Sequence, residues 1–158
     1  MALFSLRMAN ITQDSRYIEV VEQELYNNIL AGIAQDGKSF FYVNPLEIKP
    51  QQCMPHTSRA HVKSRRQKWF GVACCPPNIA RTLASLGQYI YGVDGTSIYT
   101  HLYIGNQTDI PVNNNVVQIT MDSMFPWEGN IKVKVQGVKE NIKLYLRCLL
   151  YTSPSPRD

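Results

Sequence analysis

The spacing of apolar residues changes near Gly92, and this change limits the chain to a helical part followed by a β part. Before it, four apolar residues recur at four-residue intervals, which places them on one face of a helix: Val21, Leu25, Ile29 and Ile33. After it, apolar and polar residues alternate, as in strands with one buried face, most cleanly over residues 131–135 and 142–146. We therefore predict an α+β chain.

The helical part should begin with two helices within residues 1–34. Asp14 and Ser15 divide them, and either residue could cap the second helix. Residues 40–43 (FFYV) should form a short strand or extended segment. Residues 44–68 form a long polar loop, and loops of this length are usually functional or disordered. Because this loop leads to an unusual cysteine pair, we expect it to border a substrate pocket.

The β part is divided by residues that are typical of turns. They occur at Asp94-Gly95, at residues 113–115 (NNN) and at residues 128–130 (EGN). Further alternating segments lie at residues 97–104 and 116–121. This pattern predicts an antiparallel β unit that forms half of a sandwich.

Two adjacent cysteines, Cys74 and Cys75, are followed by two prolines. Pro77 suits the first helical position and biases Pro76 away from α geometry, so a helix should begin at about Pro77. Apolar residues continue at helical spacing along one face: Ile79, Leu83, Leu86 and Ile90. Both sulfurs therefore lie just before a helix N-terminus, whose partial positive charge favours the thiolate.

The spacing of these thiols leaves three interpretations open: packing in a core, nucleophilic catalysis or metal binding. Cysteine often packs as a small hydrophobe, and spacing alone favours that role. A thiolate is also a nucleophile and a zinc ligand. No second Cys/His pair follows at the spacing of a zinc finger, and the other candidate ligands form no recognised pattern: Cys53, His56, His61 and His101.

Composition excludes several classes of protein. The formal charge of +4 is mild, and the basic cluster at residues 63–68 lacks the length and module of a nucleic-acid-binding surface. The four cysteines do not form a disulfide framework, which favours the cytoplasm over an oxidising compartment. No run of 18 or more apolar residues occurs, so we expect no membrane partner. The sequence predicts no particular oligomeric state.

Residues 69–81 (WFGVACCPPNIAR) are very similar to the signature segment of glycoside hydrolase family 127, the β-L-arabinofuranosidase family. Five further segments resemble the family in the same order, and together they span nearly all of residues 1–147: 14–17 (DSRY), 24–27 (ELYN), 36–38 (DGK), 41–47 (FYVNPLE) and 125–129 (FPWEG). Val72 departs from the commoner family pattern, in which a third cysteine precedes the pair. That cysteine is neither nucleophile nor metal ligand in the family.

The resemblance implies a zinc-dependent retaining glycosidase whose partner is a carbohydrate substrate. In the family, a zinc-bound cysteine thiolate attacks the anomeric carbon of a β-L-arabinofuranoside, and water then hydrolyses the thioglycosyl-enzyme. The first cysteine of the pair is the nucleophile, so this role falls on Cys74. Cys74 and Cys75 would both bind Zn²⁺. Tyr42 and Trp69 are candidates for contacts with the sugar, with buried packing as the alternative for each.

The resemblance also implies an internal fragment of a longer enzyme. Residues 1–91 correspond to the last helices of an α/α barrel catalytic domain, and residues 92–147 correspond to the start of a β-sandwich domain. In the family, three further groups come before the segment that the start of this chain resembles. They are the other two zinc ligands, a glutamate and a cysteine, and the acid/base glutamate. Residues 148–158 resemble translated sequencing-adapter sequence, with a Ser/Pro-rich tail as the alternative.

Without those groups, we expect this chain alone to be essentially inactive, because general acid catalysis contributes roughly 10²–10⁴ in rate and loss of the metal costs more. Two other functions stay open at this point. One is a carbohydrate-binding β module without catalysis. The other is a thiol redox or structural zinc protein that uses Cys74 and Cys75.

Overall fold

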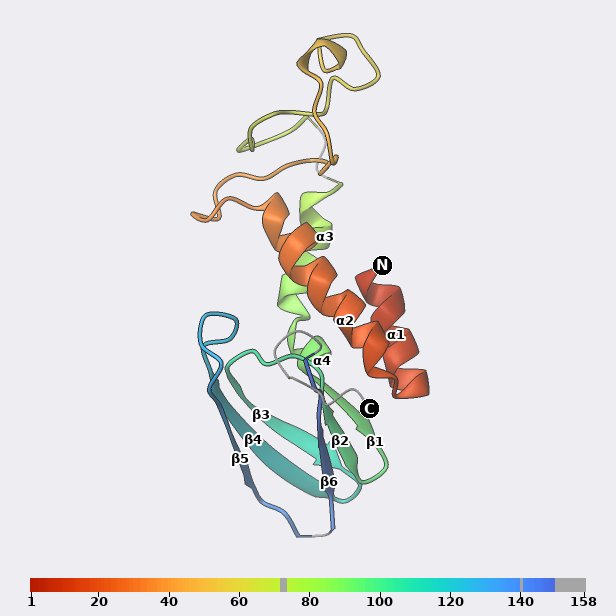
Figure 1. Ribbon diagram of the computed structural model, residues 1–158, viewed down its shortest axis with the longest axis vertical. Coiled ribbons are helices and arrows are strands. Elements are labelled where there is room, and N and C mark those ends of the chain that lie inside the picture. Colours follow the sequence, from red (N-terminus) through yellow and green to blue (C-terminus); the bar gives the residue numbers. More distant parts are fainter. Residues whose placement is uncertain (72–73, 140, 150–158) are drawn as a thin grey trace, which may run out of the picture. The chain divides into compact units, whose positions relative to one another are not determined.

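The computed structural model describes three stretches of the chain: residues 1–71, 74–139 and 141–149. These residues form two compact units, whose helices and strands are labelled in Figure 1. The helical unit comprises residues 1–5 and 19–86. The β unit comprises residues 6–18 and the described residues from 87 to 149.

The chain begins with the two predicted helices, α1 (Ala2–Thr12) and α2 (Ser15–Glu24). Asp14 lies between them, and its Oδ1 accepts a hydrogen bond from the backbone N–H of Arg16 at 3.0 Å. The bond satisfies an N–H group that the first turn of a helix otherwise leaves without a partner. Of the two candidate caps, the structure therefore selects Asp14.

The second helix changes its hydrogen-bond pattern before it ends. It continues as a π-helix, η1 (Leu25–Ile29), and then as a 3₁₀-helix, η2 (Leu30–Gly32). The N–H of Leu30 donates to Leu25 O, five residues back, whereas the N–H of Ile33 donates to Leu30 O, three residues back. Ile33 is itself extended, so the helix ends at Gly32 and Ile33 is not part of the predicted helical stripe.

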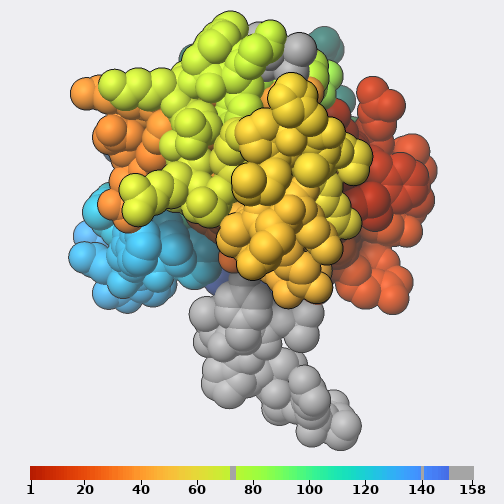
Figure 2. All heavy atoms as spheres, turned by 90° about the horizontal axis from the view of Figure 1, so that it is seen from above, coloured from red at the N-terminus to blue at the C-terminus, as the bar shows by residue number. Residues whose placement is uncertain are grey.

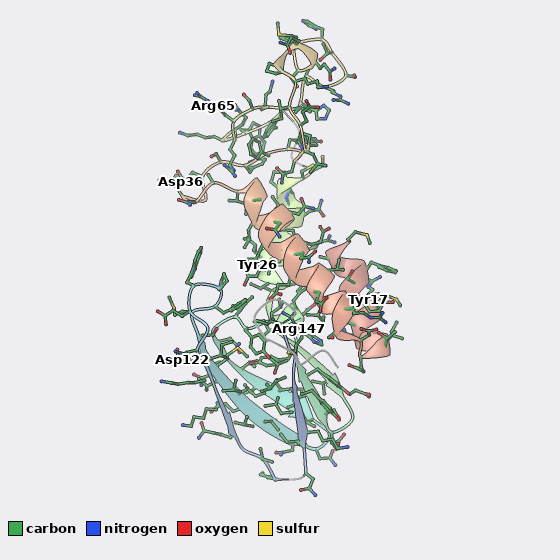
Figure 3. All side chains as sticks on the ribbon, in the orientation of Figure 1. Tyr17, Tyr26, Asp36, Arg65, Asp122 and Arg147 are labelled. Carbon is green, nitrogen blue, oxygen red and sulfur yellow. The ribbon has the colours of Figure 1, made fainter. Side chains whose placement is uncertain are left out.

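A long connection leads from η2 to the cysteine pair. Phe40 forms antiparallel bridges with Ile33 and Gln67, so the strand expected over residues 40–43 is reduced to this point. The connection includes a turn of 3₁₀-helix, η3 (Pro50–Gln52). The middle of the connection is yellow in Figure 2 and lies uncovered on the face turned to the reader, and the side chain of Arg65 points outward in Figure 3.

The helix after the cysteines begins one residue before its predicted start. This helix, α3 (Pro76–Ala84), carries both prolines in its first turn. The apolar pattern predicted one helix as far as Ile90, but α3 ends at Ala84 and a separate short helix follows, α4 (Gly87–Ile90). Part of the reason is local, because the Ser85 hydroxyl donates to Arg81 O at 2.8 Å and competes with the helical pattern.

The β unit contains two three-stranded sheets. The first has the order β1-β2-β6, formed by Tyr91–Asp94, Ser97–Thr100 and Lys143–Leu146. The second has the order β3-β4-β5, formed by Asn106–Val112, Asn115–Ser123 and Ile131–Gln136. Three strand pairs are antiparallel, as predicted, but β2 and β6 pair in parallel, with Tyr99 opposite Tyr145. The chain returns from the second sheet to the first after β5, which makes this parallel pair possible.

Side chains from both sheets share one apolar core. The buried members come from β2, β3 and β4: Ile98, Ile110, Val112, Val117 and Ile119. Partly buried side chains from β5 and β6 pack against them, including Val133, Val135 and Leu144. A helical segment followed by a two-sheet β unit is the predicted α+β fold class.

A second apolar cluster includes the last described residue. Leu149 is 9% exposed and clusters with Tyr103 and Met121. The adapter origin of residues 148–158 stays a prediction, and residues 150–158 lie outside the described part of the chain. Among the described helices, none has the length and apolar character that a membrane span requires.

Candidate active site

The two adjacent cysteines lie at the start of α3. Cys75 occupies the N-cap position with φ −85° and ψ −45°, and its side chain makes no capping hydrogen bond. Cys74 precedes it in a bend and is exposed, whereas Cys75 is half-buried. Their Sγ atoms lie 3.8 Å apart. Neighbouring side chains in an extended segment point to opposite sides. The backbone here instead makes the turn that two adjacent cysteines would need to bind one metal ion.

Tyr42 reaches this site from a position 32 residues earlier in the chain. Its hydroxyl oxygen lies 2.7 Å from Cys74 Sγ. The Tyr42 ring is also in contact with two aromatic rings, that of Phe70 at a centroid distance of 5.5 Å and that of His61 at 5.8 Å. These ring contacts hold Tyr42 in the position from which its hydroxyl contacts Cys74 Sγ.

The surroundings of the two sulfurs shift the pKa values of their thiols in opposite directions. The hydrogen bond from Tyr42, followed by that from Cys75, lowers the pKa of the Cys74 thiol. Burial, followed by the interaction with Cys74, raises the pKa of Cys75. The bond to Cys74 also raises the pKa of Tyr42 to about 12, so the tyrosine keeps its proton as a donor. The arrangement therefore favours a thiolate at Cys74 that accepts hydrogen bonds.

The spacing of the sulfurs fits zinc coordination. Two thiolates bound to one tetrahedral Zn²⁺, each at about 2.3 Å, lie roughly 3.8 Å apart. The observed separation of Cys74 Sγ and Cys75 Sγ is 3.8 Å. No group of three or more Cys, His, Asp or Glu side chains within the described ranges could hold a metal. Cys74 and Cys75 could thus supply two of the four ligands of a tetrahedral zinc site, which would need two others.

A hollow of about 230 Å³ lies beside the pair. Residues from the end of the second helix, the following segment and α3 line it: Asn28, Ile29, Gly32, Phe41, Tyr42, Asn44, Cys75 and Ile79. A second hollow of about 400 Å³ shares Asn28 and Asn44 with the first. Of the loop over residues 44–68, Asn44 and Leu46 line these two hollows.

The other sequence-predicted residues lie elsewhere. Trp69 is 68% exposed and does not line either hollow, so its contact with a sugar stays a prediction, as does that of Tyr42. His101 is buried in the β unit. Sequence reasoning missed Asn44, whose Nδ2 donates to Asn28 O at 3.1 Å. Its signal was its place two residues after Tyr42 in the FYVNPLE segment.

Comparison with known proteins gives the class to which this chain belongs. Residues 1–88 match the family model described as the GH127 catalytic domain of β-L-arabinofuranosidase, and residues 97–151 match that of the GH127 middle domain. The chain thus joins part of a glycoside hydrolase catalytic domain to part of its middle domain. It belongs to glycoside hydrolase family 127, the β-L-arabinofuranosidase family.

Individual relatives agree with this assignment. The chain is 39% identical over 137 residues to the non-reducing end β-L-arabinofuranosidase of Bifidobacterium longum subsp. longum, with 85% of this chain and 20% of that protein covered. A crystal structure of a GH127 β-L-arabinofuranosidase from Geobacillus stearothermophilus T6 is 42% identical, with a TM-score of 0.72, and the match covers 85% of this chain and 21% of that one. A GH127 β-arabinofuranosidase structure is 31% identical, with a TM-score of 0.79, and 93% of this chain and 21% of that chain are covered. The chain therefore spans about a fifth of the length of these relatives.

Proposed function

We propose that this chain carries the nucleophile of a zinc-dependent retaining β-L-arabinofuranosidase, and that Cys74 is that nucleophile. The hydrogen bond of 2.7 Å between the Tyr42 hydroxyl and Cys74 Sγ carries the proposal. It favours the thiolate form of an exposed sulfur beside a hollow, and the thiolate is the reactive form of cysteine. The activity recorded in the names of the relatives supports a β-L-arabinofuranoside as the substrate.

In the first step, Cys74 Sγ attacks the anomeric carbon of the sugar. A carbon–sulfur bond forms while the bond to the leaving-group oxygen breaks, and that oxygen takes the electron pair. It also needs a proton from a general acid, and we expect a glutamate from another part of the enzyme to supply it. Tyr42 donates a hydrogen bond to the thiolate before attack and orients the sulfur.

In the second step, a water molecule attacks the same carbon, and Cys74 leaves as a thiolate that takes the electron pair of the carbon–sulfur bond. The water gives its proton to the carboxylate that acted as general acid in the first step. Two displacements at one centre retain its configuration. Cys74 and Cys75 would hold Zn²⁺ together with ligands from the rest of the enzyme, and the bound metal would keep the thiols deprotonated. This mechanism replaces the carboxylate nucleophile of ordinary retaining glycosidases with a cysteine.

The test uses the full-length enzyme that carries this segment and an aryl β-L-arabinofuranoside as substrate. The Cys74→Ser variant should lose at least about 10³-fold in kcat, because it removes the nucleophile. A mechanism-based sugar probe should add its mass to the peptide that contains Cys74. The chain of residues 1–158 alone should show essentially no turnover.

Cys53→Ser provides the matched control, because Cys53 lies in the loop outside the site and this variant should keep full activity. Undiminished hydrolysis by Cys74→Ser would refute the role of the nucleophile. Activity that survives complete removal of zinc would refute the proposed dependence on the metal.

A further inference from the structure

We infer that Asn44 is a positioning residue, which holds Tyr42 against Cys74 by anchoring its segment to the end of the second helix. The kinetic consequences of this inference rest on the proposed function. The contacts of Asn44 and Tyr42 from which it is drawn do not depend on that function.

Tyr42 lies between two anchors to the same short stretch of helix. Before it, the backbone N–H of Phe41 donates to Gly32 O at 2.8 Å. After it, Asn44 Nδ2 donates to Asn28 O at 3.1 Å. These two bonds tie the backbone on both sides of Tyr42 to η1 and η2 and restrict its movement relative to them.

The irregular end of the second helix provides the acceptor for the second anchor. In a continuing π-helix, the N–H of Ile33 would donate to Asn28 O, five residues back. Here the helix changes to 3₁₀ geometry, and the N–H of Ile33 donates to Leu30 O instead. The carbonyl of Asn28 thus accepts the side-chain amide of Asn44. π-Helical turns occur frequently at functional sites, and this one lines the hollow beside the cysteines.

Gly32 leaves the space in which the amide lies. A Cβ atom at Gly32 would approach Asn44 Nδ2 to 3.3 Å and Ile79 Cδ1 to 3.8 Å. The first distance is tight, so a methyl group there would displace the amide by a few tenths of an ångström. Asn44 can therefore be perturbed from two sides, at its own side chain and at Gly32.

Two single variants of the full-length enzyme test the inference. Asn44→Asp has nearly the same shape, but its ionised carboxylate cannot donate to a carbonyl. Gly32→Ala keeps Asn44 and crowds it. Asn44→Asp loses the anchor and should lower kcat by about 10- to 100-fold, because misplacement of a catalytic partner by about 1 Å has effects of this size. Gly32→Ala shifts the amide by only a few tenths of an ångström, so it should lower kcat in the same direction but by less. Both variants should leave KM within about twofold. Asn114→Asp, at an exposed turn of the β unit, is the matched control and should change neither constant.

A double-variant comparison separates positioning from general support of the fold. If Asn44 acts through Tyr42, the Tyr42→Phe/Asn44→Asp enzyme should be no slower than Tyr42→Phe alone. Fully multiplicative losses would overturn the inference, as would a loss of thermal stability or zinc content that accounts for the lower kcat. An active parent enzyme with an unaffected Asn44→Asp variant would overturn it as well.

A second readout needs no glycosidase activity. In the 1–158 chain, the rate at which iodoacetamide alkylates Cys74 at a fixed neutral pH should change in the same direction for Asn44→Asp as for Tyr42→Phe. If the parent enzyme does not cleave β-L-arabinofuranosides, the proposed function fails, but this comparison still tests the inference. An alkylation rate unchanged by Asn44→Asp and altered by Tyr42→Phe would contradict it.

Discussion

Two neighbouring cysteines differ in thiol pKa because one accepts a hydrogen bond from a tyrosine and the two differ in exposure. Cys74 is exposed and accepts a bond from Tyr42, so negative charge on its sulfur is stabilised. Cys75 is half-buried, and desolvation disfavours its charged form. A single charge shared by such a pair therefore resides mainly on Cys74, which is the exposed member. Nucleophilic attack requires both the charge and the exposure.

Replacement of Tyr42 by Phe should raise the pKa of the Cys74 thiol. The tyrosine hydroxyl favours the thiolate, so its removal shifts the titration midpoint upward and leaves less thiolate at neutral pH. Alkylation of Cys74 by iodoacetamide, followed by mass spectrometry in the metal-free chain, should be slower at pH 7 and recover at higher pH. The midpoint of the rate against pH measures the shift.

A tyrosine in the β unit supplies the control for this experiment. Tyr145 stacks on Tyr99 at a centroid distance of 4.8 Å, and Tyr145→Phe should leave the alkylation profile of Cys74 unchanged. A Tyr42→Phe profile that coincides with that of the unmodified chain would show that the hydrogen bond has no effect on the thiol.

At the scale of elements, local signals in the sequence predicted most boundaries but not the partners. Asp14 marks a helix start because its carboxylate suits the first turn, and the two prolines mark the start of α3. The π-helix was not predictable, because apolar spacing does not distinguish its hydrogen bonds from those of an α-helix. Alternation likewise gives the faces of β6 but not the strand beside it or the direction of pairing.

The same limit applies to the candidate site. Cys74 and Cys75 were found because they are adjacent and precede a helix, which are local features. The bond from Tyr42 depends on a connection that folds back over 32 residues, and residue spacing contains no measure of that. The family resemblance identified the segment of Tyr42, and the structure added the contact.

Within the β unit, a buried histidine follows β2 directly and lies against β1, and its titration should make stability depend on pH. His101 is 6% exposed and lies against Gly92, where a Cβ atom would come within 2.5 Å of Nε2. Burial, followed by the charge of Arg147, lowers the pKa of His101 from 6.5 to about 4. Arg147 is held in place, because its Nε donates to His101 O at 2.7 Å.

The unfolded chain should therefore bind a proton at His101 that the folded chain does not bind until about pH 4. Below pH 6.5, protonation favours the unfolded state, so the free energy of unfolding should fall as the pH decreases towards 4, by up to about 3 kcal/mol. Urea unfolding of the β unit between pH 4 and pH 7 measures this change. His101→Gln should show a weaker dependence on pH, whereas His56→Gln, in the exposed loop, should retain that of the unmodified chain. Equal slopes for His101→Gln and the unmodified chain would contradict the assignment.

At the scale of the whole molecule, buried apolar side chains are distributed unevenly. The β unit contains a continuous two-sheet core, whereas residues 44–68 contribute Val62 as a buried apolar side chain among mostly exposed neighbours. The candidate site is thus connected to a segment with little core of its own. Segments of this kind open at a lower free energy than the core of a domain.

Hydrogen exchange should reveal this difference directly. Amides in β4 (Asn115–Ser123) pair with β3 on one side and β5 on the other, and Val117 and Ile119 are fully buried, so β4 should exchange most slowly among the described elements. Residues 45–66 should exchange at least about a hundredfold faster, because few of their amides have backbone partners. Peptide-level mass spectrometry of the 1–158 chain measures both rates, and the same peptides in the full-length enzyme provide the comparison. If residues 45–66 become protected there while β4 is unchanged, the rest of the enzyme orders the loop; equal protection of the two segments in the 1–158 chain would refute the uneven core as the cause.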